Sequence, residues 1–391
     1  MQTKILFVSF VLSMFIASVD TNAQNPVSKP ENNASKTIWD IPHKTFREKW
    51  MWIHRSTVKL ITKEHAVNYD TAYIKSYYKR LVIILPVSTR LLKFSIVDLN
   101  SGNKLIFAPN LQYNLEIGIS SKWASFIVNT GIKVFNYDTD TKGNTKYQDY
   151  QLNLYGRKIT TSSFVQYYSG YYIKNSKSYP SYVSEDPYTV RADVNALNIG
   201  VSSMYILNNK KLSIGSSFGF VEQQKKSAGS LLLGLYYFYF EANGSPSLVT
   251  PPFRSSFDTL SYIHSVHINN FGLNLGYIYT LVFLKKCYAT GSVVQGLGGK
   301  IVNYKGDESS INHNSFGGAG NLNLRLALGY DNGRYIIGAM GMIDYFLFSE
   351  KSDPTVNYSF GKFTVYLGYR FSILRGERKL LHNLNLIDFK Y

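Results

Sequence analysis

His313 and Ser315 are the two residues of this chain whose types and spacing best suit catalysis. Residues two positions apart on a β-strand project from the same face, so the imidazole and the hydroxyl can meet. A histidine that takes the proton of a serine hydroxyl makes that oxygen a nucleophile for acyl transfer. The pair therefore defines one functional hypothesis, the hydrolysis of an acyl ester.

The segment 313–317 resembles the H-x-S-x-G segment of outer-membrane phospholipase A, a twelve-stranded barrel. Phe316 departs from the pattern, because that family has asparagine at this position. The segment also has the polarity of an external loop rather than of barrel wall. A polar loop is therefore the favoured interpretation, and a barrel-embedded lipid acyl hydrolase is the alternative.

Gly215–Gly219 matches the G-x-S-x-G pattern of a nucleophile elbow. That motif works only on a sharp turn from a strand into a helix, which exposes the serine. Here Ser217 lies in alternating, strand-like sequence, and no helix is predicted after it. We therefore interpret the glycines as spacing within a strand and expect no catalysis there.

Two groups of residues have the composition of a metal site but not its spacing. Residues 138–143 resemble a calcium loop, yet Lys142 would place a cation among the ligands and the final glutamate is absent. His264 and His267 are three positions apart, which puts them on opposite faces of a strand. Cys287, the single cysteine, cannot form an internal disulfide. We expect no metal and no cofactor.

The elements that would position these residues are β-strands, and the segment 321–330 has the clearest pattern. Its apolar residues fall at every second position and therefore share one face. Arg325 is centred on the other face, between Asn323 and Ala327. A charge on one face and only apolar residues on the other favour lipid outside and a polar interior. The apolar face comprises Leu322, Leu324, Leu326, Leu328 and Tyr330.

The same alternation recurs along the rest of the chain. Between Ala196 and Leu197 the apolar set changes parity, which predicts a β-bulge there. The thirteen candidate strands are 81–97, 104–120, 123–136, 147–158, 161–174, 188–206, 211–223, 227–241, 266–280, 284–297, 318–330, 334–348 and 356–372.

The lengths of the connections decide how many of these segments cross a membrane. Single-chain bacterial barrels have an even number of strands, with short turns at one end and long loops at the other. The connections alternate in this way only if 211–241 is a single crossing with an irregular kink at 223–229. We therefore predict an all-β protein, a transmembrane antiparallel up-and-down β-barrel of about 12 strands over 81–372, with about 10 or 14 strands as alternatives.

The N-terminus predicts export to the bacterial outer membrane. A positive residue, a short apolar stretch and a small-residue cleavage site form a cleavable signal peptide over residues 1–23. The apolar stretch is too short to span a bilayer, which takes about 20 residues, and no later run is long enough for a helical span. We expect 24–80 to be a short periplasmic linker and pre-barrel segment, and 373–391 to be a basic periplasmic tail.

Composition fits an exported barrel better than a soluble enzyme, because the chain has 32 tyrosines and 24 phenylalanines but only 17% charged residues. A two-layer β-sandwich is the alternative, but so many long strands with tyrosine-rich apolar faces would over-fill its core. The net charge of +17 is dispersed along the chain, which disfavours nucleic acid as a partner. We expect contact with outer-membrane lipid, including anionic lipopolysaccharide, and with a small anionic solute.

Three short segments, 69–74, 107–110 and 224–230, resemble a family of Bacteroidota-type exported proteins called domain of unknown function 4421. The resemblance extends from Tyr69 to Phe371. It implies an outer-membrane β-barrel without an assigned activity, and it implies no catalytic residues.

Charged residues on the predicted inward faces are the remaining functional candidates. They comprise four arginines and one lysine against two acids, which predicts a positive lumen that attracts anions. Charges of both signs also form ion networks that fill a barrel, because an unpaired buried charge is costly. We therefore predict a non-enzymatic pore or an envelope structural protein, with structural filling favoured over a conducting path. The lumen candidates are Glu116, Lys133, Arg157, Arg191, Asp193, Arg325 and Arg370.

Overall fold

The computed structural model describes residues 68–371, except for 78–79, 99, 112, 122–123, 134–137, 258–261, 307–312 and 349–354. The predicted signal peptide, most of the predicted linker and the predicted C-terminal tail lie outside the described residues. Within the described ranges, no helix is long and apolar enough to cross a membrane.

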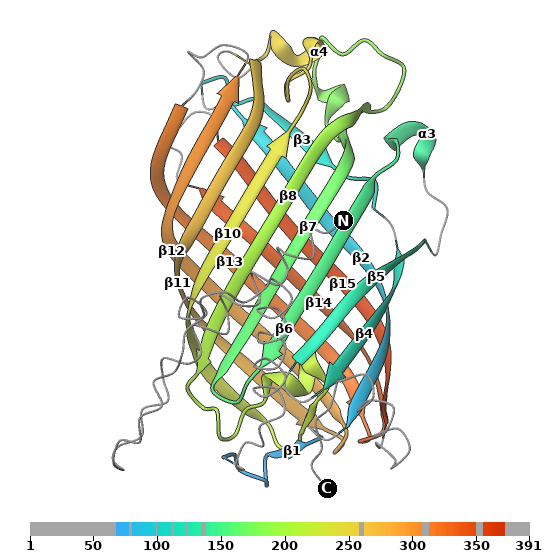
Figure 1. Cartoon of the computed structure of the whole chain (residues 1–391), viewed down its shortest axis with the longest axis vertical. Coiled ribbons are helices and arrows are strands. Elements are labelled where there is room, and N and C mark those ends of the chain that lie inside the picture. The colour runs from blue at the N-terminus through green and yellow to red at the C-terminus, as the bar shows by residue number, and fades with distance from the viewer. Residues whose placement is uncertain are drawn as a thin grey trace, which may run out of the picture. The chain divides into compact units, whose positions relative to one another are not determined.

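A closed ring of antiparallel strands forms the wall of the protein (Figure 1). The last strand, β15, pairs with the first wall strand, β2, along the full length of both. The predicted transmembrane up-and-down barrel of about twelve strands is therefore confirmed, and the sandwich is wrong, because a sandwich would have free sheet edges. The twelve wall strands are β2 (Leu81–Val97), β4 (Asn114–Ser121), β5 (Ala124–Lys133), β6 (Lys146–Tyr155), β7 (Ile159–Ile173), β8 (Thr189–Ile206), β10 (Ala228–Asn243), β11 (Ile263–Phe283), β12 (Cys287–Gly306), β13 (His313–Asp331), β14 (Tyr335–Phe348) and β15 (Thr355–Phe371).

The two ends of the barrel differ. We name the end at which β2 begins and β15 ends the terminal end, and the opposite end the loop end. At the loop end the short strand β3 (Lys104–Ala108) pairs with both β2 and β7, whereas the shorter β4, β5 and β6 complete the ring toward the terminal end. The predicted single strand 104–120 therefore divides into β3 and β4. Pro109 has no N–H for a strand ladder, and the side chain of Asn110 instead donates to the carbonyl oxygen of Gly143 at 2.8 Å.

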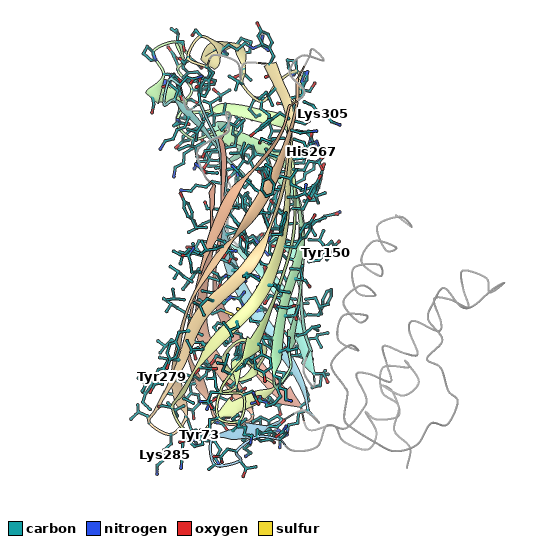
Figure 2. The ribbon with its side chains drawn as sticks, turned by 90° about the vertical axis from the view of Figure 1, so that its left-hand side faces the viewer. Tyr73, Tyr150, His267, Tyr279, Lys285 and Lys305 are labelled. Carbon is teal, nitrogen blue, oxygen red and sulfur yellow. The ribbon has the colours of Figure 1, made fainter. Side chains whose placement is uncertain are left out.

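Side chains alternate along the wall between an apolar outer face and the lumen. In β13, Leu326 and Leu328 are 66% and 57% exposed, whereas Ala327 between them is buried. Every wall strand contributes at least one large apolar side chain to the exposed outer face, and tyrosines such as Tyr150 and Tyr279 add to it (Figure 2). A soluble protein rarely exposes a continuous apolar surface of this extent, so the outer face matches lipid.

The connection from β8 to β10 folds into the terminal end of the lumen. Instead of the predicted strand over 211–223, the chain forms a turn of π-helix, η4 (Gly215–Gly219), and then β9 (Glu222–Gln224), which pairs with β1 (Ile74–Ser76). The strand prediction is wrong because every residue of 212–221 is buried, whereas a wall strand has one exposed face. We call residues 212–221 the plug.

The plug also changes two expected boundaries. The crossing predicted over 211–241 is confined to β10, which begins at Ala228, so most of the predicted kink at 223–229 precedes the wall strand. The connection after β8 is the long segment that carries the plug, although it lies at the end of the barrel where the sequence predicted short turns.

The predicted bulge in β8 is displaced along the strand. The register of β8 against β7 shifts between Arg191 and Asn195, and not between Ala196 and Leu197. Gly170 of β7 faces this shift with a φ of +90°, and a Cβ atom there would lie 2.3 Å from a backbone carbonyl oxygen. The parity change visible in the sequence is thus real, but the backbone absorbs it nearer the loop end.

Leu273 lies at the centre of β11, and its side chain is 66% exposed on the outer face. Leu273→Arg is expected to lower the free energy of unfolding in phospholipid vesicles by about 2–4 kcal/mol, because arginine near the bilayer midplane must leave water. Val183 lies in the connection between β7 and β8 and is 90% exposed. Val183→Arg is therefore the control, with an expected change below about 0.5 kcal/mol. Equal effects of the two substitutions in denaturant titrations would contradict a lipid-facing wall.

Candidate functional site in the barrel lumen

Packed aromatic side chains fill the loop end of the lumen. Phe94 of β2 stacks on Phe107 of β3 with ring centroids 4.6 Å apart, and Phe240 of β10 packs on Phe94 at 5.5 Å. The connection between β10 and β11 carries the short helix α4 (Pro251–Arg254) and adds the buried ring of Phe253. We call this cluster, which also includes Phe238 and Phe346, the loop-end core. It places apolar side chains, rather than a water-filled path, across this end of the described lumen.

Arg191 and Asp193, two of the lumen candidates, hold the connection between β10 and β11 in place. Arg191 donates from Nη1 to the carbonyl oxygen of Leu248 at 2.7 Å and from Nη2 to that of Ser247 at 2.6 Å. Asp193 accepts from Nε and Nη2 of Arg191 at 2.9 and 2.7 Å, and from the backbone N–H of Ser245 at 2.9 Å. These residues therefore pair with each other and fix the loop-end core.

A buried cluster of four charges joins β2, β4, β6 and β15. Arg90, which is 4% exposed, donates from Nη2 to Glu116 at 2.5 Å and from Nε to Asp149 at 2.6 Å. Lys362 donates to the other carboxylate oxygen of Glu116 at 2.8 Å, and the Ser88 hydroxyl donates to Glu116 at 2.7 Å. We call Arg90, Glu116, Asp149 and Lys362 the ion cluster. Its two positive and two negative charges balance.

The sequence singled out Glu116 but not its three charged partners. The sequence signal for them is their position on the inward face of a strand. Phe363, for example, is 49% exposed on the outer face, so its neighbour Lys362 must point into the lumen. Applying the alternation rule to every charged residue of the candidate strands would have found them. Their pairing could not have been found in this way, because Lys362 and Glu116 are 246 positions apart in the chain.

A cavity of about 120 Å³ lies in the middle of the lumen. Phe238 and Phe346 of the loop-end core line it on one side, and Met204 and Phe218 line it on the side of the plug. We call this cavity the chamber. Its volume suffices for a group of ordered waters or for one small solute.

Arg325 is the lumen candidate that the structure places at the chamber. Its Nε lies 3.2 Å from Oδ1 of Asn323, and its Nη1 lies 3.3 Å from Oγ of Ser162 on β7, across the lumen from β13. Asn323 also donates to the carboxylate of Asp344 on β14. Asp344, which the sequence did not single out, lines the chamber as well. A cation and an acid thus share one amide partner in this wall.

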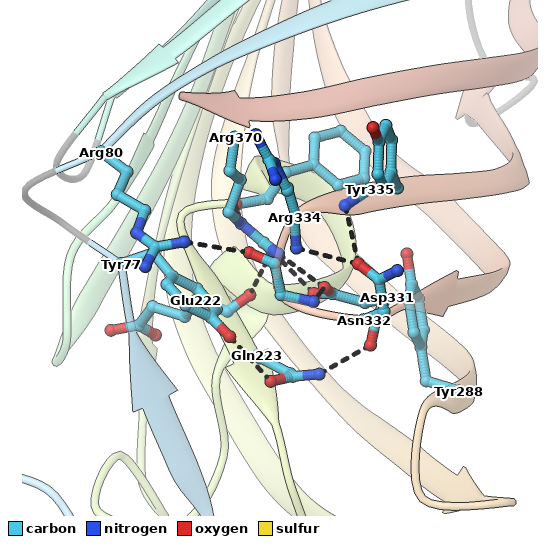
Figure 3. A network of polar contacts seen from close by, with 12 residues as sticks. Tyr77, Arg80, Glu222, Gln223, Tyr288, Asp331, Asn332, Arg334, Tyr335 and Arg370 are labelled. Carbon is cyan, nitrogen blue, oxygen red and sulfur yellow. Dashed lines mark hydrogen bonds and ion pairs between the residues drawn. The ribbon is translucent and has the colours of Figure 1, made fainter. Parts of the chain in front are cut away.

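Arg370 of β15 anchors the plug to the wall (Figure 3). Its guanidinium donates to both carboxylate oxygens of Asp331 at 2.5 and 2.7 Å, and to the backbone carbonyl oxygens of Phe220 and Glu222 at 2.9 and 3.3 Å. It also lies 4.3 Å from the ring centroid of Tyr77. The planar fork of arginine suits this site because it meets a carboxylate with two parallel hydrogen bonds. Arg370 therefore faces the interior, as predicted, but serves to hold the plug.

Arg157 lies in the turn between β6 and β7 rather than on the strand face where the sequence placed it. It forms an ion pair with Glu222 and donates to the backbone carbonyl oxygens of Asn209 and Leu212 at 3.3 and 3.1 Å. The hydroxyl of Ser213 also donates to Glu222. Arg157 is thus a second polar contact that holds the plug at the terminal end.

His313 and Ser315 lie in β13, where they pair with Tyr304 and Val302 of β12. The prediction that this segment is a loop is therefore wrong, because the wall extends farther toward the loop end than its polarity indicated. The Ser315 hydroxyl is buried and has no hydrogen-bond partner in the part of the chain that the structure describes. The side chain of His313 lies outside the described residues, and so does that of Lys133, the remaining lumen candidate. The hydrolase alternative stays a prediction.

The serine of the G-x-S-x-G segment has a structural partner. Ser217 lies in η4, within the plug, and not in a strand as predicted. Its hydroxyl oxygen is 2.6 Å from that of Thr290 on β12, which in turn lies 2.9 Å from the hydroxyl oxygen of Thr280. This row of hydroxyl groups ties the plug to the wall.

The two groups with metal-like composition have other roles. Lys142 pairs with Asp138 at 3.3 Å around the short helix α3 (Thr139–Lys142). Nδ1 of His267 lies 3.1 Å from the hydroxyl of Tyr239. Among the residues that the structure describes, no group of three or more His, Cys, Asp or Glu side chains could hold a metal ion.

These features define a transmembrane β-barrel with a plugged lumen. The chain belongs to the family described as domain of unknown function (DUF4421), which matches residues 68–371. No curated protein matches the chain.

Three solved structures are similar to the chain at low sequence identity. The Pseudomonas putida toluene transporter TodX is 8% identical, with 80% of this chain and 97% of that chain covered and a TM-score of 0.28. The translocator domain of the autotransporter NalP from Neisseria meningitidis is 10% identical, with 83% and 96% covered and a TM-score of 0.31. OmpT of Vibrio cholerae is 9% identical, with 74% and 97% covered and a TM-score of 0.26.

Glu116→Gln is expected to lower the free energy of unfolding by about 3–5 kcal/mol, because Arg90 and Lys362 would keep buried charges without their shared acid. Glu185→Gln is the matched control, since Glu185 is exposed in the connection between β7 and β8. That control is expected to change the free energy by less than about 0.5 kcal/mol. Urea titrations of both folded barrels in detergent micelles measure the difference. Equal midpoints would show that the ion cluster does not stabilise the barrel.

Proposed function

We propose that this protein is a non-enzymatic outer-membrane pore for small solutes, that the plug closes its terminal end and that the loop-end core closes its other end. The observation that carries the proposal is that a separate segment, residues 212–221, fills the terminal end of the lumen. The plug lies between the end of β8 and the start of β10 and pairs with neither in the wall ladder. It can therefore leave the lumen without breaking the hydrogen bonds that close the barrel.

The contacts that hold the plug favour a gate over a permanent filling. The plug has no charged side chain of its own, so Arg370 and Arg157 hold it at the terminal end by hydrogen bonds to the backbone carbonyl oxygens of Phe220 and Leu212. Four buried apolar side chains oppose release, each by about 1.5–3 kcal/mol. We therefore expect a pore that is closed most of the time. The four side chains are Leu212, Ile214, Phe218 and Phe220.

We infer an outer-membrane location with the terminal end toward the periplasm. The predicted signal peptide and the apolar outer face support export to that membrane. Turns such as 284–286 and 332–334 at the terminal end are short, whereas 174–188 at the loop end is long, as in bacterial barrels. In this orientation the loop end would contact lipopolysaccharide.

Arg370→Gln is expected to increase the open probability in planar-bilayer recordings by about tenfold or more, because it removes the hydrogen bonds from the guanidinium to the carbonyl oxygens of Phe220 and Glu222. Arg334→Gln is the control at the same end, since Arg334 is exposed and its Nε donates to the hydroxyl of Tyr369 at 2.7 Å. The control is expected to match the wild type.

Replacement of 209–226 by a two-residue Asn-Gly turn provides a second variant, in case Arg370→Gln folds poorly. We expect openings that are more frequent than in the wild type, because the wall strands are intact and only the loop-end core still closes the lumen. A folded barrel without the plug that carries no current would contradict the pore and favour a purely structural role.

A further inference from the structure

The side chains that line the chamber suit an apolar guest molecule. It is lined mainly by apolar atoms, and the rings of Phe164, Phe238 and Phe346 follow one another along its loop-end side. The centroid of Phe238 lies 6.2 Å from that of Phe164 and 4.1 Å from that of Phe346. Met204 and Met340 complete this lining, and methionine side chains adapt readily to the shape of a guest.

The volume of the chamber corresponds to about one aromatic ring. An apolar protein cavity of about 150 Å³ holds a benzene molecule. The chamber measures about 120 Å³, somewhat less than that cavity, so a single ring with a short substituent fits only where the adaptable methionine side chains of the lining move aside.

One polar group of the chamber lacks a partner. Asn274 of β11 is 6% exposed, and its Nδ2 donates to the hydroxyl of Ser202 at 3.1 Å. Its Oδ1 is buried and has no hydrogen-bond partner in the described part of the lumen. Gly296 leaves room there, because a Cβ atom at that position would lie 2.6 Å from this oxygen. A buried acceptor without a partner is unfavourable, so a guest that donates a hydrogen bond gains from this site.

The charges that line the chamber are balanced. Lys362 is paired with Glu116 in the ion cluster at 2.8 Å. Arg325 and Asp344 are joined through the amide of Asn323. An anionic or cationic guest would leave one charge without compensation in a buried site, whereas a neutral guest would not.

We propose that the chamber binds a neutral molecule of one aromatic ring that carries a hydroxyl group. The ring lies against the phenylalanines, and the hydroxyl donates to Oδ1 of Asn274. This inference names the class of solute that the proposed pore carries. It rests on the proposed function in one respect, because the pore is the route by which the molecule reaches the chamber.

Methionine methyl groups report binding directly, because Met204, Met340 and Met342 all line the chamber. In the full-length folded barrel in micelles, ¹³C-methyl spectra are expected to show saturable shifts of these three resonances with benzyl alcohol. Benzoate and benzylammonium, which have the same ring, are expected to bind at least about tenfold more weakly. Benzoate that binds as tightly as benzyl alcohol would overturn the inference and favour the anionic solute predicted from sequence. Absence of any saturable shift would overturn it as well.

Toluene tests the hydrogen bond without any substitution. It has the ring but no hydroxyl, so it is expected to bind wild-type protein about tenfold more weakly than benzyl alcohol. In Asn274→Leu the two molecules are expected to bind equally. Gly291→Ala is the control, because Gly291 does not line the chamber and a methyl group there would meet only Leu326, on the outer face, at 3.7 Å. The assignment of Asn274 would be overturned if wild-type protein bound toluene as tightly as benzyl alcohol. It would also be overturned if Asn274→Leu still bound benzyl alcohol more tightly than toluene.

Failure of this inference is distinguishable from failure of the pore. The methionine spectra measure binding in a closed barrel, and the bilayer recordings measure conductance without any aromatic guest. Binding without conductance in the plug-free barrel would leave a binding protein, whereas conductance without binding would leave a pore for other solutes.

Discussion

Closure of the strand ring is the constraint on which the rest of the structure depends. In a bilayer each backbone N–H and C=O must find its partner within the protein, because lipid offers none. The pairing of β15 with β2 meets this requirement by joining the last strand to the first. Closure also separates two faces, so the outer residues must be apolar and charges can lie only inside. The alternation seen in every wall strand follows from that separation.

Closure creates a lumen that the wall alone does not fill. A barrel of this size lies between fully packed and openly aqueous. The chain occupies the space with the loop-end core and the plug, and most described charges of the lumen bind these fillings or one another. Arg191 and Arg370, for example, each pair with an acid and also donate to backbone carbonyl groups of a filling segment. The predicted surplus of arginine is therefore a set of attachments rather than a free positive field.

The fold could be predicted because alternation is a local property of each strand, and β2 has the bounds that the sequence indicated, Leu81–Val97. The plug could not be predicted in this way. Its large apolar residues all fall at even positions, as they would on one face of a strand: Leu212, Ile214, Phe218 and Phe220. Only contacts with distant strands decide that all sides of this segment are buried. The same limit applies to the candidate site. Inward parity identified Arg370, but its pairing with Asp331 depends on how strands from separate hairpins meet.

A reversible lock on the plug tests the central claim most directly. Ser217→Cys and Thr290→Cys place thiols where hydroxyl oxygens lie 2.6 Å apart, and Cys287→Ser removes the single native cysteine. Adding Arg370→Gln raises the frequency of opening, so that the effect of the lock can be measured. Planar-bilayer recording of this barrel is predicted to show no current when the disulfide is formed and repeated openings after reduction. Currents that are the same in both states would contradict a plug that closes the pore.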